Sequence, residues 1–264
     1  MVSRSFVVGV ACALLAQGRP AAAASREPVD TALILAVDVS NSVDDQRYLL
    51  QLEGIAAALE DPGVIATVTG GLAGAILVTL VTWSDRPKIA VPWTRVASAA
   101  DARLLARQNR SLSFQGGEFT CVAGMLRFVA DKLLTQVPAQ ASRVVIDVSG
   151  DGSENCNPQM PASAIRDEII AQRVVINGLP ILEGREGPRL ADWYAANLVG
   201  GLGAFNLPAA GYADFARAIR QKFIAEIAGL PQPDGQGSAS RLQQRLVAVD
   251  SGVEPLRLGQ PLQR

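Results

Sequence analysis

An unbroken apolar run at residues 33–37 is followed directly by the polar sequence Asp-Val-Ser-Asn-Ser. Five apolar residues are too few for a buried helix, and they suit a strand that is covered on both faces. In open sheets of such strands, ligands bind to the loops that follow the carboxyl ends. The run therefore predicts a buried strand that leads into a ligand-binding loop carrying Asp38, Ser40 and Ser42.

Composition supports one folded domain and excludes several kinds of site. The chain has 264 residues, 49% of them hydrophobic, which is enough for a sizeable core. Its formal charge of −1 gives no basic field, so no nucleic-acid partner is expected. Histidine is absent from the sequence, which excludes Ser-His-Asp and Cys-His nucleophiles and His-ligated zinc. The three cysteines are also too few for a zinc site built from thiolates alone.

Residues 1–24 have the pattern of a cleaved signal peptide. Arg4 supplies the positive charge, residues 6–16 form a short apolar region, and residues 21–24 are all alanine and suited to cleavage. The apolar region is too short to span a bilayer, so no transmembrane segment is expected after signal removal. Cys12 lies inside this region without the large aliphatic residue that usually precedes a lipoprotein cysteine. The mature protein is therefore expected to be exported, either periplasmic or secreted.

Strand and helix patterns alternate along residues 30–229, which predicts the α/β class: a doubly wound, largely parallel sheet with helices on both faces. The expected strands are residues 33–37, 75–83, 88–93, 143–149, 174–179 and 203–207. The expected helices are residues 43–59, 97–107, 120–134, 161–172, 190–197 and 212–228. A glycine-rich connection at residues 64–74 contains a Val-Ile-Ala-Thr-Val portion that fits neither pattern. Residues 230–264 have the Pro/Gly/Gln/Ser-rich start and weak periodicity of a flexible tail.

Three loops carry oxygen ligands near the expected carboxyl ends of the strands. The first has Asp38, Ser40 and Ser42, the second has Thr120 at a helix start, and the third has Asp151 just after a strand. Carboxylates and hydroxyls suit a hard cation such as Mg²⁺ (or Mn²⁺), with waters completing six positions and one position open to an incoming carboxylate. Helix capping alone would explain one such residue but not all of them.

These loops resemble the metal-ion-dependent adhesion site of the von Willebrand factor A domain, which combines an Asp-x-Ser-x-Ser loop with a distant Thr and a more distant Asp. The resemblance implies that Ser40, Ser42 and Thr120 contact the metal directly, whereas Asp38 and Asp151 act mostly through waters. The stretches Leu-Ala-Val-Asp-Val-Ser, Val-Pro-Trp-Thr, Val-Ile-Asp-Val-Ser-Gly-Asp-Gly and Ile-Asn-Gly-Leu-Pro-Ile more narrowly resemble an uncharacterised bacterial family of exported von Willebrand A-like proteins. A von Willebrand A-like domain is thus expected at residues 30–229.

Two features depart from the pattern of that domain. Glu118 and Phe119 stand between the Gly-Gly pair and Thr120, so Glu118 either closes the open metal position or points to solvent. Asp147 is a second candidate carboxylate, but it lies two residues inside the strand end, where a buried hydrogen-bonded role is expected. Asp151, beyond the strand, is therefore the expected ligand.

Cys121 follows Thr120, and Cys156 lies shortly after Asp151. Convergence of the two loops on one metal would bring the two cysteines together, and an exported protein meets an oxidising compartment. We therefore expect a Cys121–Cys156 disulfide beside the metal site. Two unrelated buried thiols are the alternative.

The expected function is an exported, metal-dependent protein-binding module for adhesion or assembly, and not an enzyme. Its Mg²⁺ would bridge to a carboxylate on a protein partner. One alternative is a metal-dependent hydrolase, although the sequence offers no evident general base. The other is a scaffold whose metal site is vestigial, for instance closed by Glu118.

Overall fold

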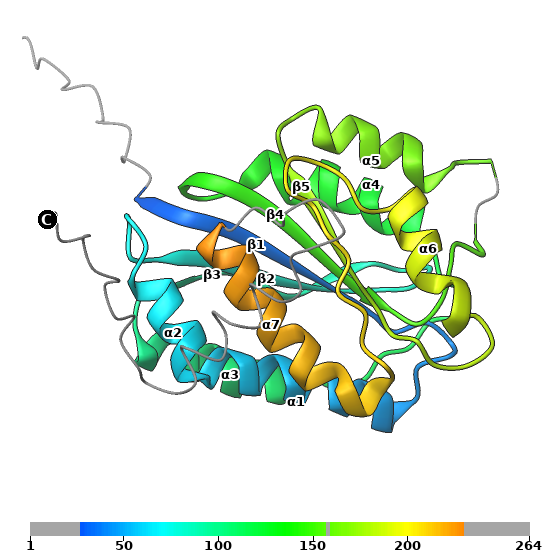
Figure 1. The fold of residues 1–264 in the computed structure, drawn as a ribbon, viewed down its shortest axis with the longest axis horizontal. Coiled ribbons are helices and arrows are strands. Elements are labelled where there is room, and N and C mark those ends of the chain that lie inside the picture. The colour runs from blue at the N-terminus through cyan, green and yellow to red at the C-terminus, as the bar shows by residue number, and fades with distance from the viewer. Residues whose placement is uncertain (1–26, 157–158, 230–264) are drawn as a thin grey trace, which may run out of the picture.

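One five-stranded sheet, in the order β3-β2-β1-β4-β5, forms the centre of the computed structural model, which describes residues 27–156 and 159–229 (Figure 1). β1 pairs in parallel with β2 and β4, β5 pairs in parallel with β4, and β3 is antiparallel to β2. The strands are β1 (Pro28–Asp38), β2 (Ile76–Trp83), β3 (Lys88–Val96), β4 (Gln140–Gly150) and β5 (Val175–Pro180). The expected largely parallel sheet is confirmed, whereas the expected signal peptide (1–24) and tail (230–264) lie outside the described residues.

Helices cover both faces of the sheet (Figure 1). One face carries α1 (Asp45–Glu60), α2 (Pro62–Thr69), α3 (Ala99–Arg110) and α7 (Phe215–Ala228), and the other carries α4 (Val122–Lys132), α5 (Ala162–Ile170) and α6 (Gly187–Asn197). Two short 3-10 helices are η1 (Leu134–Gln136) and η2 (Tyr212–Asp214). Among the described residues, no helix combines the length and the apolar character needed to cross a membrane.

The apolar run of β1 is unbroken because each of its faces packs against a different helical layer. Leu33, Leu35 and Val37 belong to the core beneath α1 and α7, whereas Ile34 and Ala36 belong to the core beneath α4 and α6. Alternate side chains of a strand point to opposite faces, so both sets must be apolar. This double burial makes β1 the central strand.

Two segments differ from the sequence predictions. The unassigned portion at 64–74 begins within helix α2, which Asp61 caps by accepting from the N–H groups of Gly63 and Val64. Asp61 is therefore the C-cap of α1 and the N-cap of α2. Pro62 suits the first position of α2, because an N–H group there would have no acceptor within the helix. The strand predicted at 203–207, all described, is wrong: Asn206 forms only a single bridge to Gly178 at the edge of β5.

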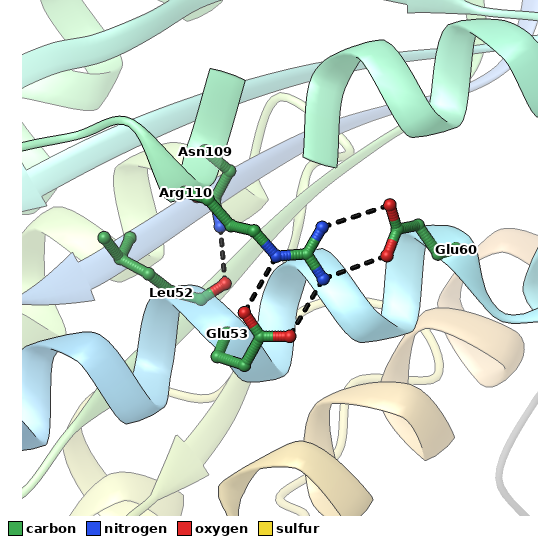
Figure 2. Close-up of polar contacts among 5 residues, drawn as sticks. All are labelled: Leu52, Glu53, Glu60, Asn109 and Arg110. Atoms are coloured by element: carbon green, nitrogen blue, oxygen red, sulfur yellow. Dashed lines mark hydrogen bonds and ion pairs between the residues drawn. The ribbon is translucent and has the colours of Figure 1, made fainter. Parts of the chain in front are cut away.

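Polar contacts fix α3 against α1, the helix that follows the first candidate loop (Figure 2). Arg110 donates to both oxygens of Glu53 at 2.8 Å and to both oxygens of Glu60 at 2.9 and 3.0 Å. Asn109 donates from its buried side-chain amide to the carbonyl of Leu52 at 2.6 Å. Hydrogen bonds from Arg110 lower the pKa of Glu53 and of Glu60.

A buried group of charges joins α7 to β4. Lys222 Nζ lies 3.3 Å from Asp147 Oδ1 and 3.1 Å from Glu226 Oε1, and all three residues are at most 2% exposed. Lys222 also donates to the Gly178 carbonyl at 3.2 Å. Burial, followed by the charge of Glu226, raises the pKa of Asp147, while Lys222 opposes the rise. Asp147 is thus buried as expected, but it is paired with a lysine.

Replacing Lys222 with the similarly long methionine would leave Asp147 and Glu226 buried without a cation. We expect Lys222→Met to lower the free energy of unfolding by about 3–5 kcal/mol in urea denaturation. Arg217→Met on the same helix removes the exposed ion pair with Asp214 and should change the free energy of unfolding by less than about 1 kcal/mol. Equal effects of the two substitutions would contradict a structural role for the buried group.

Candidate metal site

The side chains of the three predicted loops meet at the carboxyl ends of β1 and β4. Ser42 Oγ donates to Asp151 Oδ1 at 2.5 Å, and Thr120 Oγ1 donates to Ser40 Oγ at 3.2 Å. The hydroxyls of Ser40 and Ser42 are 3.3 Å apart. Asp38 Oδ1 accepts the N–H of Ser40 at 2.7 Å. The structure therefore brings all five predicted residues into one cluster.

Backbone contacts place the first two loops side by side. Val39 continues the pairing of β1 by donating to Trp83 O at 2.9 Å, and its own carbonyl accepts the N–H of Gly117 at 2.9 Å. A Cβ on Gly117 would stand 1.9 Å from Ser84 Oγ, so this close approach requires glycine. Gln51, on α1, donates from its buried side chain to Asp38 O at 3.1 Å and holds the end of β1.

A disulfide joins the second loop to the third. Cys121 and Cys156 are bonded, with their Cα atoms 4.9 Å apart, which confirms the predicted pairing. Asn155 Oδ1 accepts the Thr120 N–H at 2.8 Å, and Asn155 N–H donates to Thr120 O at 3.1 Å. Glu154 accepts the N–H of Ala123 at 2.7 Å at the start of α4. These contacts fix Thr120 relative to the loop that carries Asp151.

Unpaired buried oxygens beside the cluster show that it suits a cation. Among the described residues, Asp38 Oδ2 and the Tyr194 hydroxyl are buried and lack a hydrogen-bond partner. A Cβ on Gly150 would stand 2.8 Å from Asp38 Oδ2 and 2.9 Å from the Tyr194 hydroxyl, so glycine leaves a space between them. Burial, with the charge of Asp151 second, raises the pKa of Asp38 to about 7. A nearby cation would counter both causes of this rise.

The set of donors suits a hard metal. The cluster contains two carboxylates and three hydroxyls, which favour Mg²⁺ or Mn²⁺ over metals that prefer sulfur or imidazole. Within residues 27–156 and 159–229, no group of three or more His, Cys, Asp or Glu side chains could hold a metal. The hydroxyls are therefore essential to any metal site here.

A second layer ties the first loop to the segment after β5. Arg47 donates to Ser42 O and, at 2.9 Å, to Glu183 Oε1, and its guanidinium lies 5.3 Å from the ring centroid of Tyr212. Glu183 Oε2 accepts the Tyr212 N–H at 3.1 Å. Burial and the charges of Asp151 and Asp38 raise the pKa of Tyr212.

Tyr194 and Tyr212 were not among the residues predicted from the sequence. Both lie in segments whose only sequence signal is helical periodicity, and no spacing relates them to Asp38. Glu118, for which two roles were open, is exposed, and its backbone N–H donates to Asp85 Oδ1 at 2.8 Å. Of the two predicted roles, the exposed position of Glu118 matches the one in which its side chain points to solvent.

Comparisons with solved structures identify the fold. Proximal thread matrix protein 1 from the mussel byssus is similar with a TM-score of 0.58 and 14% identity, over 77% of this chain and 48% of that one. The structure of the same protein with a zinc-occupied MIDAS motif has a TM-score of 0.56 and 13% identity, over 78% of this chain and 50% of that one. A von Willebrand factor type A protein from Catenulispora acidiphila has a TM-score of 0.53 and 16% identity, over 75% of this chain and 43% of that one. This chain spans about half the length of these structures.

A family model gives the membership of the chain. None of the curated proteins matches this chain. The model described as "Protein of unknown function (DUF1194)" matches residues 28–231, which is most of the sequence. The chain therefore has the von Willebrand factor A fold and belongs to this family of unknown function.

Proposed function

We propose that this chain is a metal-dependent protein-binding module in which Asp38, Ser40, Ser42, Thr120 and Asp151 hold Mg²⁺ or Mn²⁺. The observation that carries the proposal is the contact of these side chains across three loops, beside the unpaired Asp38 Oδ2. A set of oxygen donors that converge from distant parts of the chain, at the ligand-binding edge of the sheet, is typical of a metal site.

The residues divide the work of binding. The hydroxyls of Ser40, Ser42 and Thr120 are the direct ligands, and Asp38 and Asp151 act mostly through waters. A metal bound there would supply an open coordination position for a carboxylate presented by a protein partner. Arg47 and the Cys121–Cys156 disulfide hold the loops in place, so little reorganisation accompanies binding.

Protein binding is better supported than hydrolysis. A metal-dependent hydrolase needs a base or a metal-bound water that is poised over a substrate. The sequence has no histidine to serve as that base, and Asp38 and Asp151 are the residues that the proposal assigns to holding the metal. A protein of similar fold is a thread matrix protein of the mussel byssus, and one of its structures has zinc in its MIDAS motif.

Export is part of the proposal. Residues 1–24 would direct the chain to the periplasm or beyond the cell, and the disulfide is of the kind that persists in an oxidising compartment. A metal-dependent contact with a carboxylate on a protein partner suits adhesion or assembly outside the cytoplasm.

Asp38→Ala tests the metal site. We expect the variant to fold but to lose detectable Mg²⁺ binding in calorimetric titration, and millimolar Mg²⁺ should raise the Tm of the wild type but not that of Asp38→Ala. Asp45→Ala removes an exposed carboxylate from the first turn of α1 and should leave Mg²⁺ binding intact. An unchanged Mg²⁺ affinity in Asp38→Ala would refute the site.

Tyr194→Phe tests whether the buried hydroxyl positions Asp38. The Tyr194 hydroxyl borders the same space as Asp38 Oδ2 without bonding to it, so it would act on Asp38 through a water, and its loss should weaken Mg²⁺ binding by about tenfold. The control is Tyr48→Phe, a buried tyrosine that packs against Phe114. Calorimetric titration gives the Mg²⁺ affinity of both variants. Equal affinities would show that the Tyr194 hydroxyl has no role in metal binding.

The disulfide should matter to both stability and metal binding. We expect Cys121→Ser/Cys156→Ser to lower the free energy of unfolding by about 2–4 kcal/mol. Mg²⁺ affinity should also fall, because Thr120 and Asp151 lie on the two loops that the bond joins. Urea denaturation and calorimetry of the oxidised wild type and the double variant give the two values, and unaltered metal affinity would show that the hydrogen bonds of Asn155 suffice.

A further inference from the structure

Two clefts flank the candidate metal site and differ in charge. The first, of about 740 Å³, lies between Asn41 of the metal loop, the turn that joins β2 to β3, and residues 115–118. The second, of about 490 Å³, is bounded by Ser153, which follows Asp151 in the third loop, and by the start of α6.

Charges in the first cleft are balanced within the cleft. Asp85 Oδ2 lies 3.4 Å from Arg86 Nε, and Asp85 Oδ1 accepts the backbone N–H of Glu118 at 2.8 Å. Lys88 donates to the side chain of Gln115. With two basic and two acidic side chains, this cleft gives no preference for a partner of either sign.

The second cleft, which we call the arginine cleft, is lined by Arg185, Arg189, Glu186, Leu190 and Trp193. Its one acidic side chain, Glu186, accepts the N–H of Ser153 at 2.8 Å, so one carboxylate faces two arginines in this cleft. Both arginines are exposed, and within the described part of the chain neither side chain has a hydrogen bond or an ion pair. The arginine cleft is therefore net positive.

The wall of the arginine cleft connects it to the metal site. Trp193 is partly buried and packs edge-on against Tyr194, with ring centroids 5.9 Å apart. Tyr194 is the residue whose hydroxyl lies beside Asp38, and Ser153 is two residues from Asp151. The arginine cleft and the metal cluster therefore share the third loop and helix α6.

We propose that the arginine cleft binds a second acidic side chain of the same protein segment whose carboxylate completes the metal site. The inference rests on the proposed function and specifies its partner as a segment with two acidic residues. Guanidinium groups bind carboxylates through paired hydrogen bonds, and the apolar wall accommodates the methylene stem of a glutamate. The charge difference between the clefts also fixes the direction in which the segment lies across the site.

The test uses pairs of synthetic peptides and calorimetry in Mg²⁺. Acetylated and amidated Gly-Asp-Gly-Gly-Glu-Gly is compared with the same peptide carrying Gln in place of Glu, and further pairs lengthen the glycine spacer. The wild-type protein should bind the best two-acid peptide about tenfold more tightly than its Gln counterpart, as one charge-assisted hydrogen bond provides. EDTA should remove the shared, metal-dependent part of the affinity for both peptides.

A matched pair of variants separates position from net charge. Arg185→Ala/Arg189→Ala should abolish the difference between the two peptides, whereas Arg103→Ala/Arg107→Ala, which removes the same charge from two exposed positions on α3 outside both clefts, should retain it. Mg²⁺ titration without peptide should be unchanged in both variants. A wild type that binds Mg²⁺ but does not distinguish the peptides at any spacer overturns the arginine cleft alone, as does a difference that persists in Arg185→Ala/Arg189→Ala. A wild type that fails to bind Mg²⁺ overturns the proposed function itself.

Discussion

The hydrogen bond between Ser42 and Asp151, 2.5 Å long, joins the loops that follow two neighbouring parallel strands, and the candidate site depends on it. It is possible because β1 and β4 pair in register, with Val37 opposite Ser149, so both strands end at the same edge. Thr120, on the second loop, is not placed by the sheet itself. It reaches the cluster through the Gly117–Val39 backbone bond and through the disulfide.

Two buried carboxylates on neighbouring strands show how this fold treats negative charge. Asp147 has a cation from within the chain, because α7 brings Lys222 to 3.3 Å from it, and it shares that lysine with Glu226. Asp38, at the end of β1, has Asp151 as a charged neighbour and, in the described residues, an oxygen without a partner. Burying an unpaired carboxylate costs several kcal/mol. A cation from solution is the simplest means of offsetting that cost at Asp38.

Local apolar runs were enough to predict the five strands of the sheet, although the strand expected at 203–207 did not form. The resemblance to the von Willebrand A domain was needed to relate the three loops, and with them the two cysteines, to one another. Residues 64–74 were missed because Asp61 and Pro62 look like a helix stop, although they also begin α2. No sequence signal marks Lys222 as buried, because its burial depends on the packing that brings α7 to Asp147 of β4. Tyr194 reaches Asp38 only through the packing of α6, which no sequence spacing records.

The most direct test of the account is paramagnetic broadening of amide signals by Mn²⁺ in the ¹⁵N-labelled, oxidised protein. If three loops form one metal site, substoichiometric Mn²⁺ should first broaden the amides of Ser40, Thr120 and Gly152, and Ser40→Ala should abolish the effect. Broadening confined to exposed acidic residues such as Asp44 and Asp45, or none at all, would contradict the claim that these loops bind a metal.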